Sequence, residues 1–230
     1  YLLKKKLIKA DYIFTASSHF SYIGVEFLAH KLGIKNFPKK KSISKILNKT
    51  EFYTFLKNEN INIPWTKRIF KKKDLIQYKN LKNIFFLKSD FGKSPYYIYK
   101  GEINTLLKKN IHWKKNNFLK KNYLLQKNFK GKEIRVNVFQ KKCLCFYFKN
   151  GKKILKNDKK RFDDLKILKS LLLINKKLEI EKLLVKYDVI ISDTGYVVID
   201  IGLDPPQRML NHFNRTQRNF YKFYLKFFIR

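Results

Sequence analysis

The sequence predicts an α+β fold, in which helices and antiparallel hairpins share one compact unit. Several stretches repeat apolar residues at helical spacing, while others have the composition of strand pairs joined by short polar turns. Hydrophobic residues make up 44% of the 230 residues, which is enough for a core although 30% are charged. These features exclude a disordered polycation.

The first half of the chain begins with a pattern typical of the end of an α/β unit. The segment "ADYIFTASSHFSYIGVEFLAHKLGI" predicts a short buried strand, a loop, and a helix through Val25–Leu32 that ends at Gly33, the expected C-cap. A helix is expected over Lys49–Lys57, followed by an alternating segment at Ile61 and Ile63. The segment "NIFFLKSDFGKSPYYIYK" then predicts a strand, a Gly/Ser loop and a second strand.

The second half predicts more strands than helices. Three strand-like runs lie in "NYLLQKNFKGKEIRVNVFQKKCLCFYFKNGKK", a helix in "DDLKILKSLLLINKKLEIEKLL", and a hairpin in "YDVIISDTGYVVIDIGLDPP". The end, "NFYKFYLKFFIR", predicts an amphipathic helix that packs on the core or on a second subunit, with a membrane surface as the alternative. We expect a domain boundary near Lys39–Ser42, with 1–41 as the truncated end of an α/β domain and 42–230 as the main domain.

Charge and cysteine content limit the partners and the compartment. The chain has 53 basic and 17 acidic residues, a formal net charge of +36 spread along its whole length. We interpret this as surface composition rather than as a nucleic-acid footprint, although such a field attracts anionic small molecules such as nucleotides. Cys143 and Cys145 suit neither a disulfide nor a metal site, which favours a reducing cytoplasm. No apolar run reaches the roughly 18 residues of a membrane span.

Two acids of the hairpin are candidate metal ligands. With a three-residue loop at 193–195, Ser192 faces Tyr196 and, further along, Asp188 faces Asp200, with Cβ atoms about 5 Å apart. Like charges in this position repel, and a divalent cation such as Mg²⁺ turns the repulsion into attraction. Mn²⁺ is an alternative ion.

Two alternatives compete with this metal site. A two-residue loop at 194–195 would slip the register by one and turn the two acids to opposite faces. A solvent-facing strand with acids for solubility is the other alternative. The apolar runs "VII" and "VVI" beside the acids favour a buried sheet, in which unpaired charge is costly. Asp193 is better explained as a turn former. Asp204 is also interpreted as the start of a turn, with a contact to the metal as the alternative.

Two more stretches carry candidate binding residues. Lys88 leaves a buried strand beside a Gly/Ser loop, where it can hold a phosphate as a point charge, although strand-end lysines are common in so lysine-rich a chain. Gln126 and Glu133 lie at the ends of two consecutive strands. Gln126 can form hydrogen bonds with an adenine edge, and Glu133 can accept hydrogen bonds from ribose hydroxyls. The alternative is that both are simply polar residues at one end of a hairpin.

In this order and spacing, the motifs resemble those of the ATP-grasp superfamily of carboxylate–amine ligases over about Asp11 to Arg208. The resemblance implies two α+β lobes that clasp ATP, preceded by the remnant of an α/β domain. It implies that the metal acids bind Mg²⁺ and that Glu133 and Gln126 contact ribose and adenine. It assigns nucleotide phosphates to five residues: Lys49, Lys88, Gly92, Lys93 and Ser94.

The implied activity joins a carboxylate to an amine through an acylphosphate. Lys186 falls where several members carry a catalytic arginine, and Arg208 is a second candidate catalytic residue. The chain departs from the family in having Gln126 in place of a glutamate and Gly202 in place of a third metal ligand. A degenerate domain that binds nucleotide without catalysis is therefore an alternative, as is a basic nucleic-acid-binding protein.

Overall fold

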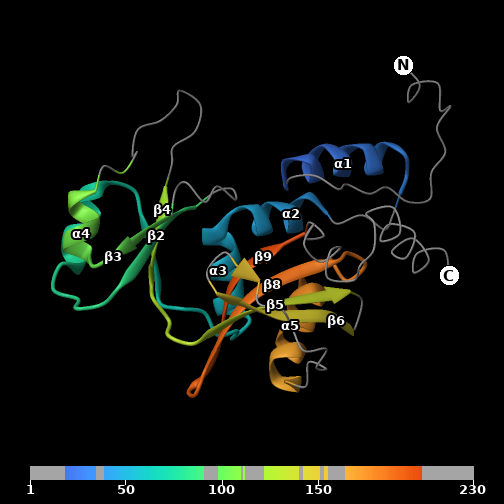
Figure 1. Cartoon of the computed structure of the whole chain (residues 1–230). Coiled ribbons are helices and arrows are strands. Elements are labelled where there is room, and N and C mark those ends of the chain that lie inside the picture. The colour runs from blue at the N-terminus through green and yellow to red at the C-terminus, as the bar shows by residue number, and fades with distance from the viewer. Residues whose placement is uncertain are drawn as a thin grey trace.

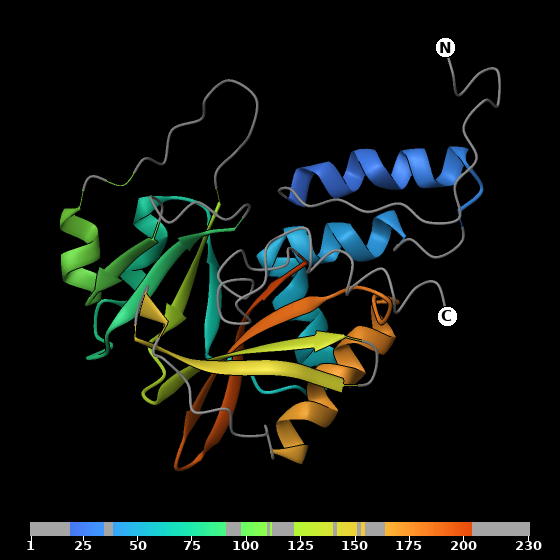
Figure 2. The same ribbon diagram turned by 45° about the vertical axis from the view of Figure 1, so that its right-hand side comes forward.

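The computed structural model describes residues 19–34, 39–90, 98–109, 111, 122–139, 142–150, 153–154 and 164–203. Its elements form two antiparallel sheets with helices packed against them (Figure 1). Three helices come first: α1 (His19–Lys31), α2 (Lys40–Leu47) and α3 (Lys49–Asn58). Helix α1 runs beside α2 (Figure 2).

The small sheet has the strand order β1-β4-β2-β3, all antiparallel. Its elements are β1 (Thr66–Ile69), the 3₁₀-helix η1 (Lys72–Tyr78), β2 (Phe85–Ser89), β3 (Ile98–Gly101), α4 (Ile103–Lys108) and β4 (Tyr123–Lys127). One face of the sheet packs against Leu75 of η1 and Leu106 of α4. Because strand residues alternate between faces, Lys88 and Gln126 lie on the other face.

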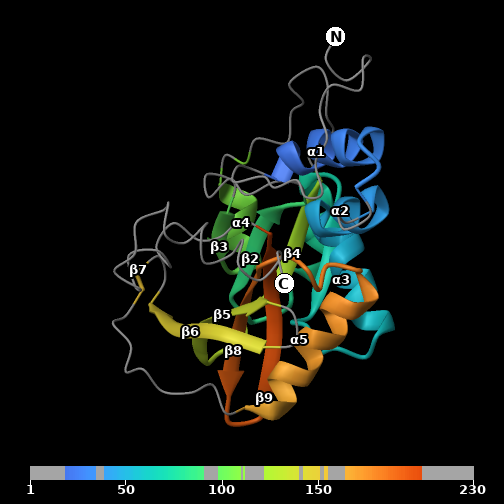
Figure 3. The same cartoon turned by 90° about the vertical axis from the view of Figure 1, so that its right-hand side faces the viewer.

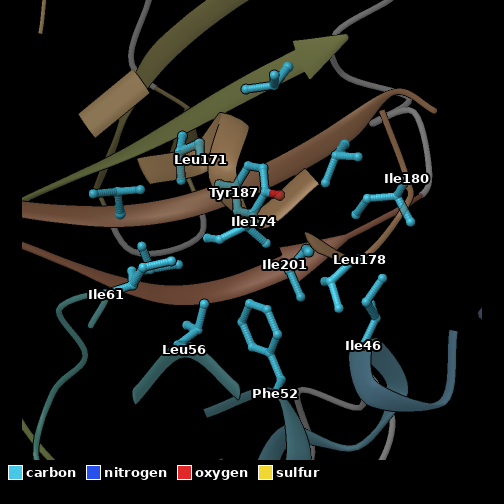
Figure 4. Close-up of a cluster of buried hydrophobic side chains, with 14 of the residues drawn as sticks. Ile46, Phe52, Leu56, Ile61, Leu171, Ile174, Leu178, Ile180, Tyr187 and Ile201 are labelled. Atoms are coloured by element: carbon cyan, nitrogen blue, oxygen red, sulfur yellow. The ribbon is translucent and has the colours of Figure 1, made fainter. Parts of the chain in front are cut away.

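The large sheet has the order β7-β6-β5-β8-β9. Its elements are β5 (Lys132–Phe139), β6 (Lys142–Asn150), β7 (Lys153–Ile154), α5 (Leu165–Lys177), β8 (Val185–Ser192) and β9 (Gly195–Gly202). Helix α5 lies along one face of this sheet (Figure 3). Figure 4 shows Phe52 of α3 and Leu171 of α5 directed at strand residues such as Ile201 in one apolar core. The opposite face therefore carries the charged residues near the hairpin acids, namely Glu133, Arg135, Lys186, Asp188 and Asp200.

Most of the elements predicted within the described residues are confirmed. The helices predicted at 25–32 and 49–57 are α1 and α3, and Gly33 after α1 has a φ of +71°, as a glycine C-cap requires. The predicted strands of the second half form β4, β5, β6, β8 and β9. The predicted strand before residue 19, the loop at 91–97 and the last helix lie outside the described residues.

Two features of the segment 40–69 were not predicted. Helix α2 was not predicted, although Ile43, Ile46 and Leu47 have helical spacing and are buried. The alternating residues Ile61 and Ile63 belong to a loop, and the strand begins at Thr66. The two-domain division at residue 41 stays a prediction. In the described part of the chain, every helix is too short or too polar to span a membrane.

Candidate functional site

The hairpin brings its two acids together, but not by the predicted turn. Ser192 pairs with Gly195, so the loop is Asp193 and Thr194, and the expected pairing of Ser192 with Tyr196 is wrong. A register shift after Asp188 then makes Ile199 an extra, bulged residue, and Asp188 faces Asp200 as predicted. The bulge cancels the slip that the shorter loop introduces, so both acids lie on one face.

Arg135 of β5 holds the first acid. It faces Asp188 across the sheet and donates from Nε to Oδ1 over 2.6 Å and from Nη2 to Oδ2 over 2.7 Å. The side chains are 17% and 8% exposed, so this two-point ion pair is largely withdrawn from water. Asp188 therefore has a fixed orientation.

Lys49 lies near the second acid, Asp200, and near Lys88. Burial lowers the pKa of Lys49 at the start of α3, and the nearby ammonium of Lys88 lowers it further. The carboxylates of Asp200 and Asp90 act in the opposite direction and raise this pKa. The predicted phosphate lysines thus come from α3 and β2 to the same place as one predicted metal acid.

Lys88 is held by two neutral oxygens. Its Nζ donates to the hydroxyl of Tyr53 over 2.9 Å and, more weakly, to the backbone carbonyl of Ile199 over 3.4 Å. The Tyr53 hydroxyl donates to the same carbonyl over 2.5 Å. Since Ile199 is the bulged residue, the irregularity that aligns the acids lies directly against a phosphate-lysine candidate.

Asp90, two residues after Lys88, ties the small sheet to α3. Its buried carboxylate accepts hydrogen bonds from the backbone N–H of Thr50 at 2.8 Å and from the Thr50 hydroxyl at 2.7 Å. The backbone N–H of Lys49 donates to the Asp90 carbonyl at 2.9 Å. An acid at a helix N-terminus is favourable, so Asp90 fixes the position of Lys49.

The position of the expected third metal ligand is filled from across the sheet. Gly202 pairs with Lys186, and a Cβ atom at residue 202 would lie 2.2 Å from Cε and 3.1 Å from Nζ of Lys186. The lysine side chain therefore lies over the glycine, on the face that carries both acids. A protonated ammonium has no lone pair, so it can bind an anion there but not a metal.

Gln126 has a defined amide orientation. It is 4% exposed, and its Nε2 lies 3.1 Å from Oγ1 of Thr66, whose hydroxyl donates to the Pro64 carbonyl over 2.8 Å. Because that hydroxyl hydrogen is already used, Oγ1 accepts from Nε2, and the Gln126 carbonyl oxygen is directed elsewhere. Glu133 lies on the same face of β5 as Arg135, two residues away.

Four predicted site residues lie outside the described part of the chain: Gly92, Lys93, Ser94 and Arg208. A hollow at the hairpin tip, lined among others by Asn60, Phe129 and Thr194, contains none of the predicted site residues. We therefore base the candidate site on the acid pair and its cations.

The acid pair suits one divalent cation. A carboxylate has about four lone-pair sites, and Arg135 uses two of those on Asp188. Within the described ranges, no three His, Cys, Asp or Glu residues converge on a point. Phosphate oxygens and water would have to complete the coordination, which is the arrangement typical of Mg²⁺.

Sequence reasoning missed Tyr53, Asp90 and Arg135. A tyrosine on the apolar side of α3 and an acid just after Lys88 were visible signals. Arg135 could be recognised only once β5 and β8 were known to be neighbours, which the sequence does not reveal.

The sequence matches no family model and no curated protein. Its fold does match solved structures. D-alanine–D-alanine ligase from Bacillus anthracis is 18% identical with a TM-score of 0.63, over 88% of this chain and 72% of that one. L-amino acid ligase from Bacillus licheniformis is 14% identical with a TM-score of 0.69, over 92% and 54%. The ATP-grasp ligase PsnB, with Mg and ADP, is 11% identical with a TM-score of 0.58, over 83% and 63%.

Proposed function

Because the chain has the ATP-grasp fold, we propose that it is an ATP- and Mg²⁺-dependent ligase that joins a carboxylate to an amine. Two proteins of this fold support the choice of cofactors, since one is complexed with ATP and another with Mg and ADP. The observation that carries the proposal is the facing of Asp188 and Asp200 on one sheet, with Lys49 near Asp200 and Lys88 near Lys49.

In this proposal the small sheet and α3 bind the nucleotide. Lys88 and Lys49 neutralise its phosphates, and the fixed carbonyl oxygen of Gln126 accepts from the exocyclic amine of adenine. Glu133 accepts from ribose hydroxyls. Gly92, Lys93 and Ser94, which lie outside the described residues, would also contact the phosphates.

The reaction has two transfers. An oxygen of the substrate carboxylate attacks the γ-phosphorus of ATP, the bond from that phosphorus to the β–γ bridging oxygen breaks, and ADP leaves. The amine nitrogen then attacks the carbonyl carbon of the acylphosphate, phosphate leaves with the bonding pair, and the nitrogen loses a proton. Both steps depend mainly on positioning and on charge neutralisation.

The two acids and the two candidate catalytic cations, Lys186 and Arg208, have different roles in the proposal. Asp188 and Asp200 would hold Mg²⁺, which neutralises phosphate charge when bound. The Lys186 ammonium, over Gly202 on the same face, would stabilise charge on the transferred phosphoryl group, together with Arg208.

A coupled assay of ADP release tests the proposal. The purified chain is incubated with ATP, MgCl₂ and a panel of amino acids and short peptides as carboxylate and amine donors. We expect ADP release that needs Mg²⁺ and both donors, and that falls at least about 100-fold in Asp200→Asn. ADP release that is absent across the panel, or independent of Asp200, would contradict a ligase.

The position of Lys186 supports a second candidate, a domain that binds nucleotide without catalysis. A lysine fills the space of the expected third ligand, so metal binding is left to two acids. A thermal shift with Mg²⁺ and ATP, but no ADP release, would favour this candidate. No such shift, combined with steeply salt-dependent binding to DNA, would instead favour the nucleic-acid binder that the charge of +36 suggests.

A further inference from the structure

The hydroxyl of Tyr53 joins three separate elements of the site. It lies on α3, accepts from Lys88 of β2 and donates to Ile199 of β9. We propose that Tyr53 is a positioning residue that fixes the Lys88 ammonium for a phosphate oxygen of the nucleotide. This inference rests on the proposed function, since it takes Lys88 as the phosphate ligand.

The hydrogen-bond directions follow from the donors available. The Ile199 carbonyl can only accept, so the hydroxyl hydrogen of Tyr53 points to it over 2.5 Å. The hydroxyl oxygen then accepts from Nζ of Lys88 at 2.9 Å. An ammonium has three hydrogens, and the contacts to described residues use two of them, which leaves one for a phosphate.

Tyr53 is a rigid support for this ammonium. The residue is 4% exposed, belongs to the main apolar core and packs beside the ring of Phe52, with centroids 5.9 Å apart. The Lys88 ammonium also lies 5.2 Å from the centroid of the Tyr53 ring, which is within cation–π range. A free lysine loses rotamer entropy when it binds a ligand, and Tyr53 removes most of that loss in advance.

The link also sets the spacing between a cation and an acid. Ile199 directly precedes Asp200, and its carbonyl reaches Tyr53 where the bulge interrupts the regular pairing. Lys88 and Asp200 come from different sheets, and the Tyr53 hydroxyl fixes their relative position because it bonds both to Lys88 and to Ile199, the neighbour of Asp200. A phosphate bound to Lys88 is thereby kept beside the acid pair.

A double-mutant cycle tests this role. Four proteins are compared by calorimetry with Mg²⁺ and a non-hydrolysable ATP analogue: wild type, Tyr53→Phe, Lys88→Met and the double variant. We expect Tyr53→Phe to weaken binding about tenfold in the wild-type background, about 1.4 kcal/mol, and to have almost no effect beside Lys88→Met. Adenosine, which has no phosphate, should bind Tyr53→Phe as it binds wild type.

Tyr187→Phe is the matched control. Tyr187 is also a buried tyrosine whose hydroxyl donates a hydrogen bond over 2.5 Å, but to Asn175 in the core. The Tyr187→Phe variant should have a lower melting temperature than wild type but the same affinity for the ATP analogue. Should Tyr53→Phe not fold, Lys88→Arg replaces it, because a guanidinium keeps the charge but not the position of the ammonium. We expect the same tenfold loss.

The outcomes separate the two proposals. If the wild type binds no ATP analogue with Mg²⁺, both the proposed function and this inference fail. If the analogue binds but Tyr53→Phe weakens it equally with and without Lys88, or weakens adenosine as much, only the role of Tyr53 fails. Wild-type affinity in Lys88→Arg would also contradict that role.

Discussion

Lys88 of the small sheet and Asp188 of the large sheet are held in different ways. On the small sheet, Lys88 rests on a hydroxyl and a carbonyl, both neutral, and its strands pair without a register shift. On the large sheet, Asp188 is held by the opposite charge of Arg135, and the pairing is shifted in two places, after Asn137 and after Asp188.

The difference determines what each sheet can still bind. A cation supported by neutral oxygens keeps its full charge, so Lys88 remains a strong partner for an anion. An acid paired with a guanidinium has much of its charge neutralised, so Asp188 attracts a metal less than an isolated carboxylate would. We therefore expect the proposed site to bind a polyanion, and a metal to bind together with it.

The largest effect on stability is expected from breaking the ion pair between Arg135 and Asp188 on the large sheet. Asp188→Asn removes the negative charge of a largely buried ion pair, and we expect a loss of about 3 kcal/mol in the free energy of unfolding. Urea denaturation measures it. The double change Arg135→Met with Asp188→Leu should recover most of the loss, because it removes both charges. A loss below about 1 kcal/mol for Asp188→Asn would show that the pair is solvated like a surface salt bridge.

The next effect is on the small-sheet side, where Asp90 ties the sheet to α3. Asp90→Ala removes the acceptor of two Thr50 hydrogen bonds, and we expect a loss of about 2 kcal/mol by the same measurement. Asn48→Ala is the control, since its side chain caps the same helix through a longer bond of 3.3 Å and should cost less. Equal losses would mean that Asp90 acts only as an ordinary helix cap.

Lys49 joins the two regions and should make stability depend on pH. Its pKa is lowered mainly by burial, so between the lowered value and 10.5 the unfolded chain binds more protons than the folded one. Stability therefore rises with pH in that window, by at most about 1.4 kcal/mol per pH unit for this proton. Lys49→Met should lose this slope, which denaturation at several pH values measures. An unchanged slope would assign it to other groups.

The smallest stability effect is expected at Gln126 of the small sheet. Gln126→Leu should cost less than about 1 kcal/mol, since Thr66 keeps its bond to Pro64. It should lower the preference for ATP over GTP about tenfold, because the directed carbonyl oxygen is lost. Competition binding measures the ratio, and Gln126→Glu, which keeps an acceptor, is the control. An unchanged ratio would remove Gln126 from base recognition.

The sequence predicted elements and faces better than it predicted contacts. The helices at 25–32 and 49–57 and the acid-bearing hairpin follow from local spacing, and the ATP-grasp fold follows from the order of the motifs. The facing of Asp188 and Asp200 was predicted correctly from a wrong loop. The bulge at Ile199 restores this facing despite the shorter loop. It adjoins the hydrogen bond between Tyr53 and Ile199, a tertiary contact that no local pattern encodes. The pairing of Asp188 with Arg135 likewise required the strand order.

The bulge at Ile199 also restricts changes in hairpin length. An odd number of residues separates Asp188 from Asp200, whereas a bulge-free hairpin with a two-residue loop separates facing residues by an even number. Deleting one residue between the acids would either remove the bulge, and with it the carbonyl that Tyr53 reaches, or turn one acid to the apolar face. Loop grafting into this hairpin should therefore tolerate insertions of two residues better than insertions of one.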